Sequence, residues 1–274
     1  MKKKKLEKIL TYMILVVTAI FILTPFIWIF LTALKSPEEV FANPPVIIPR
    51  KPQWENFLQV FRLKDFNRYV FNSVVITVAI TIGELVTTIL AAFAFSNLDF
   101  KGKDIIFTIL IGTMMVPGEV LLIPNFVTLS KLKWINTYKA LIIPWCTSIT
   151  SIFFLRQYFL NIPKQLYYAA KVDNCSDFKY LIRIMIPMAR PAIFTIAILK
   201  IINSWNAFMW PLIMTNSEKM RTLPIVLAKF SSEVGMDYHI LMAASTIIIM
   251  PMIIVFIILS KYILNGVSNS GIKG

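Results

Sequence analysis

The sequence predicts an all-α integral membrane protein with six transmembrane helices. Of its 274 residues, 57% are hydrophobic and only 15% are charged, whereas a soluble domain carries about 25% charged residues. The apolar residues gather into six blocks, and each has at least the roughly 20 residues that a helix needs to cross the hydrocarbon core. Collagen-like, disordered, coiled-coil and disulfide-stapled proteins are excluded by this composition.

The six predicted spans cover residues 9–34, 69–95, 105–127, 138–160, 184–214 and 241–264. Prolines such as Pro117 and Pro187 interrupt them, which predicts kinked helices typical of a protein that bends around a pathway. The chain is therefore expected to divide into an N-terminus (1–8), a first helix (9–35), an extracytoplasmic loop (36–68), a transmembrane core (69–265) and a C-terminal tail (266–274).

The charge distribution predicts the orientation. The 28 Lys and Arg residues against 14 Asp and Glu give 28 − 14 = +14. In a soluble protein this excess would suggest nucleic acid, but in a membrane chain it indicates the positive-inside rule and contact with anionic lipid. The tight basic clusters fall in 1–8, 97–104 and 161–183, so both termini are expected in the cytoplasm and no nucleic-acid partner is expected.

No catalytic motif is found. The sequence has no G-x-x-x-x-G-K-[ST] phosphate loop and no nucleophile elbow, and its single histidine, His239, makes a His-based metal centre improbable. We therefore expect a non-enzymatic chain without catalytic residues, metal or cofactor. If the protein uses ATP, another subunit hydrolyses it.

Two charged residues lie near the middle of predicted spans: Glu84 in the second and Lys200 in the fifth. Intramembrane charges are costly and usually face a bundle interior or a cavity. Either the two side chains pair with each other across the bundle, or each meets water or a different partner.

After Lys200, the residues Asn203, Asn206 and Trp210 follow at i, i+3 and i+7, which places them on one face of a continuous helix. Amides can bind sugar hydroxyls and an indole can stack on a sugar ring, so this face is a candidate substrate pathway. The alternative is interhelical hydrogen bonding with an interfacial tryptophan.

The loop before the fifth span, residues 161–187, reads as helix, turn and helix. Pro163 suits a first turn, the helix is expected to run through Ala170, and Asp173 and Asn174 break it before a second helix that passes Ile184 and reaches Pro187. Ala169 and Ala170 leave a smooth patch that another protein could approach closely. Alternatively, the first helix lies on lipid headgroups, anchored by its tyrosines and lysines.

The stretch YYAAKVDN followed by IMIP resembles the E-A-A-x-x-x-G … I-x-L-P loop of permease subunits in binding-protein-dependent ABC importers. Ala169, Ala170, Asp173 and Pro187 match, whereas Tyr168 replaces the usual Glu and Asn174 the usual Gly. The segments LTALKSPEEVFANPP, NSVVIT, NSWNAFMWPLI, RTLPIVL, LMAAS and SGIKG extend the resemblance over nearly the whole chain, towards the six-helix subunit of maltose-type sugar permeases.

The resemblance implies a type I ABC importer permease fold in the plasma membrane of a bacterium. It also implies a heterodimer with a second, homologous permease, two cytoplasmic ATPase subunits that dock on the coupling loop, an extracytoplasmic solute-binding protein and a carbohydrate substrate. The tail, Gly271 to Gly274, is a further expected ATPase contact. Two other readings are an ion-gradient-driven transporter or channel, which leaves the loop unexplained, and a membrane enzyme, which lacks an acid–base cluster.

Overall fold

The computed structural model describes residues 2–232 and 238–268. Over these residues the chain consists of helices and their connections, without a strand. The described residues form two compact units, one from the residues up to 66 with 226–251, and one from 67–225 with those that follow 251. The predicted ATPase contact of Gly271 to Gly274 lies outside the described residues.

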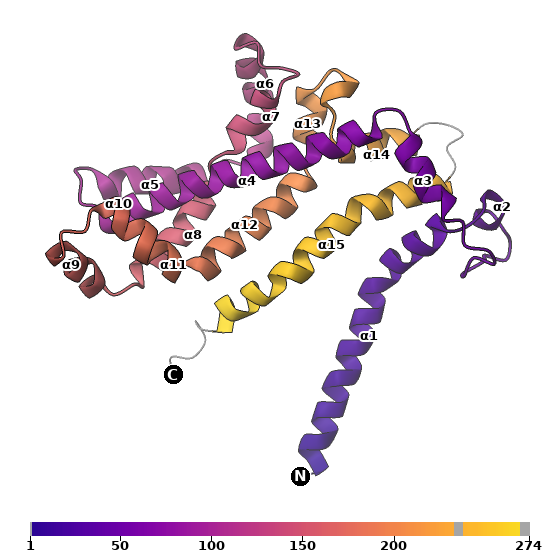
Figure 1. Ribbon diagram of the computed structural model, residues 1–274, viewed down its shortest axis with the longest axis horizontal. Helices are drawn as coiled ribbons and strands as arrows, with labels where there is room; N and C mark the ends of the chain where they lie inside the picture. Colours follow the sequence, from indigo (N-terminus) through magenta and orange to yellow (C-terminus); the bar gives the residue numbers. More distant parts are fainter. Residues whose placement is uncertain (1, 233–237, 269–274) are drawn as a thin grey trace. The chain divides into compact units, whose positions relative to one another are not determined.

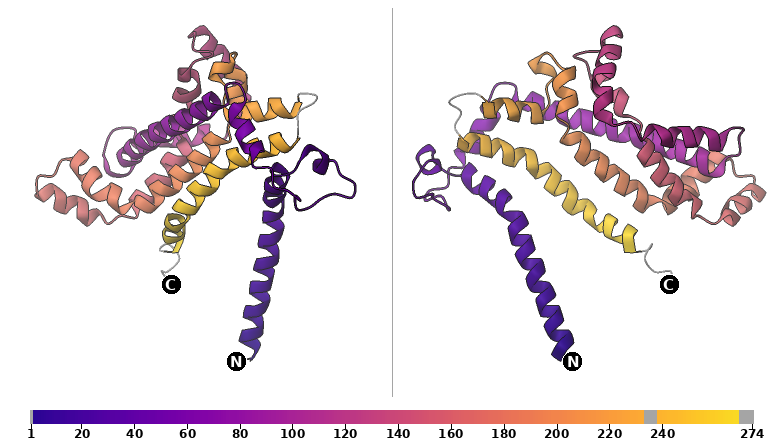
Figure 2. Two further views of the ribbon diagram at one scale, coloured as in Figure 1. Left: turned by 45° about the vertical axis from the view of Figure 1, so that its right-hand side comes forward. Right: turned by 180° about the vertical axis from the view of Figure 1, so that it is seen from behind.

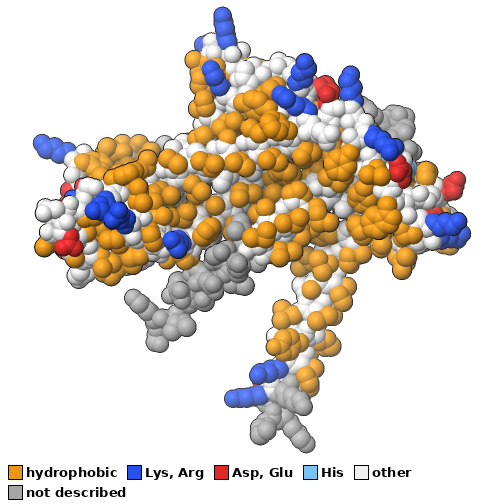
Figure 3. Space-filling model, viewed as in Figure 1, with side chains coloured by type: hydrophobic (Ala, Val, Ile, Leu, Met, Phe, Trp, Pro, Cys, Tyr) orange, Lys and Arg blue, Asp and Glu red, His pale blue; other side chains and the backbone are white. Residues whose placement is uncertain are grey.

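The first unit is built on a long N-terminal helix (Figure 1). Its helices are α1 (Lys2–Ala33), α2 (Pro37–Val40), α3 (Glu55–Arg62) and the first part of α15 (Tyr238–Ser268). Side chains 6–28 of α1 are exposed, and Figure 3 shows hydrophobic side chains along this helix, with lysines only near its start. A helix that is apolar on all sides suits contact with lipid or with other membrane helices.

The end of α1 is fixed by side-chain hydrogen bonds. The Asn56 amide donates to the backbone carbonyls of Ala33 at 2.8 Å and Lys35 at 3.0 Å, and so satisfies acceptors that a helix end leaves unpaired. The Lys35 ammonium lies 4.4 Å from the centre of the Trp28 ring. Burial lowers the pKa of Lys35, although Glu39 opposes this effect.

The second unit contains most of the remaining helices. They are α4 (Phe66–Asn97), α5 (Lys103–Thr113), α6 (Leu122–Lys131), α7 (Tyr138–Ile142), α8 (Ile149–Leu160), α9 (Lys164–Val172), α10 (Asp177–Tyr180), α11 (Ile186–Met188), α12 (Arg190–Trp205), α13 (Met209–Met214) and the start of α14 (Leu223–Ser232), with 3-10 helices at Gly118–Leu121, Ile143–Trp145 and Glu218–Met220 and a π-helical turn at Leu181–Met185.

Four helical segments are long and apolar enough to span a membrane on their own: Leu6–Ala33, Phe66–Asn97, Tyr138–Leu160 and Tyr238–Ile258. Two more spans result if each of two bent pairs is counted once, which gives the six that the sequence predicts. Lys103–Thr113 meets Gly118–Lys131 at 89°, and Asp177–Met188 meets Arg190–Trp205 at 79°. The third and fifth predicted blocks are therefore broken rather than continuous.

Proline accounts for the break in the fifth block. Helix α12 begins at Arg190, and Pro191 has no N–H to bond the carbonyl of Pro187, which favours a break at this point. The second unit is otherwise held by α4, which lies beside α8 and α12 (Figure 2). At Gly83 of α4 an added Cβ would lie 2.5 Å from the Cys146 sulfur, so this close approach requires glycine.

Candidate functional site

The two charged residues predicted near the membrane midplane form an ion pair. Nζ of Lys200 on α12 lies 2.6 Å from Oε2 of Glu84 on α4, with 14% and 3% of the side chains exposed. Ser151 of α8 donates its hydroxyl to Oε1 of Glu84 at 2.7 Å. Of the two arrangements that the sequence left open, the structure has direct pairing. Each charge thereby gains the partner that a buried charge needs.

A cavity of about 550 Å³ lies beside this pair, within the second unit. Its polar and aromatic lining comes from several parts of the chain: α4, the 3-10 helix before α6, α6 itself, the 3-10 helix before α8, α12, the connection to α13, α13 and the residue before α14. The residues that matter for ligand chemistry are Glu119, Asn125, Trp145, Lys200, Asn203 and Trp210. A cavity of this size, with few polar groups in an apolar wall, is typical of a small-molecule site.

The predicted face of Asn203, Asn206 and Trp210 does not form, and this expectation was wrong. Helix α12 ends at Trp205 and α13 begins at Met209. Pro211 lacks the N–H that would bond the carbonyl of residue 207, which favours a helix break between α12 and α13. Asn203 and Trp210 still line the cavity, but Asn206 is absent from its lining, and its amide donates to the Ile202 carbonyl at 2.9 Å.

The Trp210 side chain forms part of the cavity wall. It is 7% exposed, its indole N–H donates to the Ala140 carbonyl at 3.1 Å, and its ring packs edge-on to Trp145 with centres 5.4 Å apart and planes at 87°. Trp145 is 41% exposed and is the more accessible ring. Sequence reasoning missed it, although Pro144-Trp145 inside an apolar block marks both a break and an aromatic group.

A smaller cavity of about 300 Å³ shares α12 lining residues with the first. Lys200 and Asn203 line both cavities, and Glu84, Ser148 and Ser151 line only the smaller one. The ion pair therefore stands at the wall that the two cavities share. A polar wall of this kind inside apolar helices is typical of a solute pathway.

Side chains of α4 fix the loop between α13 and α14 beside the larger cavity. The Asn72 amide donates to the carbonyls of Lys219 at 2.9 Å and Arg221 at 2.8 Å, and its oxygen accepts from Tyr138 at 2.6 Å. The Ser73 hydroxyl accepts from the Leu223 N–H at 2.9 Å. Asn72 and Ser73 begin the NSVVIT segment. The sequence did not show that this segment fixes the loop between α13 and α14.

The loop of residues 161–187 has the predicted helix–turn–helix form. Helix α9 runs to Val172, two residues beyond the expected end at Ala170, and Asp173 follows it. Asn174 has a φ of 49°, the left-handed conformation that asparagine tolerates better than most residues. Ser176 then caps α10 by accepting from the Lys179 N–H, and the helix passes through the π-helical turn to Met188.

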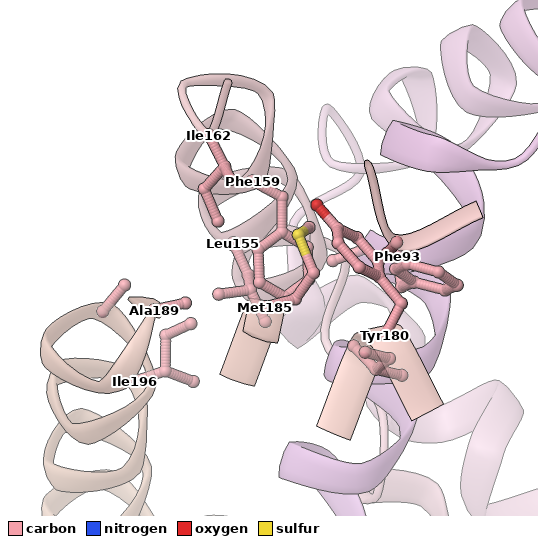
Figure 4. Packing of buried hydrophobic residues seen from close by; sticks show 12 residues of the cluster. Phe93, Leu155, Phe159, Ile162, Tyr180, Met185, Ala189 and Ile196 are labelled. Carbon is pink, nitrogen blue, oxygen red and sulfur yellow. The ribbon is translucent and has the colours of Figure 1, made fainter. Parts of the chain in front are cut away.

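The inner side of this loop packs on a hydrophobic cluster (Figure 4). Tyr180 and Met185 are almost fully buried and meet Phe93 of α4 and Phe159 of α8 in that cluster. The cluster also contains Ala170, which is 8% exposed. The expectation that Ala169 and Ala170 form one outward patch is therefore wrong for Ala170, because its methyl group faces the core of its own chain.

The outward face of the loop, which we call the loop face, consists of Tyr168, Ala169, Val172 and Phe178. All four are exposed, and Tyr168, Val172 and Phe178 are 61%, 83% and 63% exposed. Ile184 and Pro187 are half-buried behind it. Grouped exposed apolar side chains of this kind mark a surface that binds another protein or a membrane.

A hydrogen-bonded triad holds the two helices of the loop together. The Asp177 carboxylate accepts from the Tyr167 hydroxyl at 2.8 Å and lies 2.9 Å from the Lys171 ammonium. The hydrogen bond to Asp177 raises the pKa of Lys171, and burial followed by the same carboxylate raises the pKa of Tyr167. Lysine and tyrosine are protonated at neutral pH in any case, and the two upward pKa shifts extend the pH range over which these contacts persist.

Comparison with known proteins gives a consistent assignment. Residues 84–269 match the family described as binding-protein-dependent transport system inner membrane component. The chain is 34% identical to the arabinooligosaccharides transport system permease protein AraQ of Halalkalibacterium halodurans, over 99% of this chain and 100% of the relative. It is 33% identical to the trehalose/maltose transport system permease protein MalG of Thermococcus litoralis, over the full length of both.

A solved structure shows the same fold. It belongs to a bacterial ABC transporter involved in the import of the acidic polysaccharide alginate. The TM-score is 0.87 at 24% sequence identity, and the alignment covers 96% of this chain and 98% of that one. At this identity the likeness concerns the fold, and the all-α membrane permease architecture predicted from the sequence is confirmed.

Proposed function

Because the chain belongs to the family of binding-protein-dependent transport system inner membrane components, we propose that it forms half of the translocation pathway for a sugar or oligosaccharide. The family gives the class of function, a permease subunit in binding-protein-dependent import. The relatives named for arabinooligosaccharides and for trehalose and maltose suggest the class of substrate. The observation that carries the proposal is the cavity lined by Trp145, Lys200 and Asn203, whose remaining wall is mostly apolar.

In this proposal the loop of residues 161–187 couples the permease to cytoplasmic ATPase subunits. Tyr168 and Ala169 on the loop face make the contact. Ala170 and Ile184 hold the loop on the permease from inside, Asp173 and Asn174 form its turn, and Pro187 ends its second helix. The exposure of the loop face and the rigid backing of the loop support this division of roles.

The chain works as a non-catalytic subunit of a larger assembly. A second, homologous permease completes the pathway, two separate ATPase subunits hydrolyse ATP, and an extracytoplasmic solute-binding protein delivers the carbohydrate. The uncovered apolar surface of α1 supports contact with lipid or a second membrane subunit. The protein resides in a bacterial plasma membrane with both termini in the cytoplasm, and the lysines at the start of α1 support this orientation.

Glu84 and Lys200 are the residues that would have favoured ion-driven transport. Their direct ion pair supports a structural and pathway-lining role instead, since each charge already has its partner. The family match also favours import driven by separate ATPase subunits over ion-driven transport.

The proposal is tested by purifying the complete complex and measuring its ATPase activity with the solute-binding protein and a panel of sugars. We expect one neutral oligosaccharide class to stimulate hydrolysis, and this chain purified alone to hydrolyse no ATP. Turnover that survives removal of every other subunit would contradict the assignment of hydrolysis to separate subunits. A complete complex that no sugar stimulates would contradict a carbohydrate substrate.

A further inference from the structure

We propose that the larger cavity of the second unit is a subsite for an uncharged sugar ring stacked on Trp145, and that it rejects acidic sugars. The inference rests on the proposed carbohydrate pathway and adds to it a position, a recognition mode and a charge preference.

Trp145 is positioned as a stacking platform. It lies in the 3-10 helix Ile143–Trp145, where Pro144 restricts the backbone. The ring of Trp210 packs edge-on against it at 5.4 Å and is itself fixed by the hydrogen bond to the Ala140 carbonyl. Trp145 lines the cavity and remains 41% exposed. The Lys200 ammonium lies 5.5 Å from the centre of its ring, so the apolar C–H face of a sugar ring would stack on the part of the ring that this ammonium leaves open.

Two amides supply the polar contacts. Asn125 of α6 and Asn203 of α12 line the same cavity, and both side chains are exposed. Neither amide group has a hydrogen-bond partner among residues 2–232 and 238–268 in the structure. Each amide offers two donors and an acceptor, which matches the mixed donor and acceptor character of sugar hydroxyls. The volume of about 550 Å³ suits a small-molecule ligand.

The charges of the lining select against acidic sugars. Among the residues that the structure describes, the cavity has one cationic lining residue, Lys200, and its ammonium is already bound to Glu84 at 2.6 Å. The other charged lining residue is the exposed carboxylate of Glu119. A uronate or phosphate would therefore find no unpaired cation in the lining and would be repelled by Glu119. A neutral sugar carries no charge, so Glu119 does not repel it and it needs no unpaired cation in the lining.

The test is protection of an engineered cysteine in the complete complex. Asn203→Cys is introduced after Cys146→Ala and Cys175→Ser, and its rate of labelling by N-ethylmaleimide is measured in lipid nanodiscs without the binding protein. Maltotriose and arabinotriose are the neutral probes, and trigalacturonate is the acidic probe. The matched control is Asn216→Cys, an exposed position of the neighbouring loop that does not line the cavity.

We expect a neutral probe to slow labelling at position 203 but not at 216, and trigalacturonate to protect neither. Trp145→Ala should weaken protection about two- to tenfold, the value of one aromatic contact, whereas Trp145→Phe should largely retain it. Equal protection by neutral and acidic probes would refute the charge preference. Protection that is unchanged by Trp145→Ala, or absent for both neutral probes, would refute the subsite.

A second pair of variants tests the charge argument directly. Glu84→Gln releases Lys200 from its partner and Glu119→Gln removes the repulsive carboxylate, so trigalacturonate should begin to protect position 203 in at least one of them. Failure in both contradicts the role given to these charges. The subsite can fail while the proposed function stands: a complex whose ATPase responds to a sugar-loaded binding protein, but in which no probe protects position 203, is an importer without this subsite.

Discussion

The Lys200 ammonium lies 2.6 Å from the Glu84 carboxylate and so ties α12 to α4 at the wall between two cavities. Ser151 adds a hydrogen bond from α8 to the same carboxylate. Three helices of the second unit thus meet at one buried polar point. A rearrangement that separates α12 from α4 at this point must break the ion pair and give each charge another partner.

The first prediction concerns this ion pair. Lys200→Met or Glu84→Gln leaves a buried charge unpaired, a change that costs about 3–5 kcal/mol in proteins. We expect either single variant to lower the thermal stability of the solubilised complex and to impair transport. The double variant should regain much of the lost stability, because no unpaired charge remains. Strictly additive losses in thermal unfolding would show that the two residues act separately.

The second prediction concerns the loop face. Ala169→Asp adds a charge to an exposed position, so the permease should fold, insert and bind its partner permease but lose the ATPase subunits. Tyr168→Glu restores the acidic residue that is usual in the resembling loops and should be tolerated or improve docking. Co-purification of the ATPase with each variant provides the measurement, and Asn161→Asp, an exposed position outside α9, is the matched control.

If α9 instead lies on lipid headgroups, we expect a different result for these variants. Both acidic changes would then be mildly harmful through repulsion by anionic lipid, and ATPase retention would be unchanged. Full ATPase association and full sugar-stimulated hydrolysis in Ala169→Asp would therefore remove the loop face from the coupling contact.

The third prediction separates Ala170 from Ala169. Because Ala170 is 8% exposed and belongs to the cluster with Tyr180, Ala170→Leu should overfill that cluster at a cost of about 1–3 kcal/mol. The thermal stability of the permease pair, measured without the ATPase, should fall. The same change at exposed Ala169 should leave this stability unaltered. Equal effects at the two positions would contradict the inward placement of Ala170.

The fourth prediction uses the left-handed turn of the loop. Asn174 has a φ of 49°, so Asn174→Gly should be neutral or slightly stabilising, since glycine adopts this conformation without a Cβ penalty. Asn174→Val should cost about 1–2 kcal/mol or more, because a branched side chain disfavours this conformation. The two variants are compared by thermal unfolding and by ATPase co-purification. An equal response to glycine and valine would show that the turn is not strained.

The fifth prediction concerns topology. In a chain without native cysteines, Asn216→Cys should react with a membrane-impermeant maleimide in spheroplasts, which have lost the outer barrier. Lys101→Cys should react only after the membrane is permeabilised. Both positions are exposed in the structure. The reverse pattern would place the loop of residues 161–187 outside the cytoplasm, where it could not meet an ATPase.

Composition and hydrophobic block length predicted the fold class, the six spans and the two charged residues near the midplane. These properties depend on which residues are present and on local sequence, so they can be read without a structure. The turn at Asn174 was predicted for the same reason. Pro117 and Pro187 predicted kinks in the third and fifth blocks. They did not predict the angles of these kinks.

The cavity could not be read from local pattern because its walls come from distant segments. Asn125, Trp145 and Asn203 lie on different elements, and only packing of these elements brings them together. The face predicted for Asn203, Asn206 and Trp210 assumed an unbroken helix, and the break before Met209 removed Asn206 from it. The inward turn of Ala170 likewise depends on contacts with α4 and α8 rather than on the sequence of the loop.

Uptake into proteoliposomes tests directly whether this chain is a permease subunit of an ATP-driven sugar importer. The complete complex is reconstituted with the sugar-loaded binding protein outside, and ATP or a proton or sodium gradient is supplied separately. We expect uptake that requires ATP on the inner side, persists after the gradients are collapsed, and is lost in Ala169→Asp. Sugar uptake driven by an ion gradient in the absence of ATP would contradict this expectation.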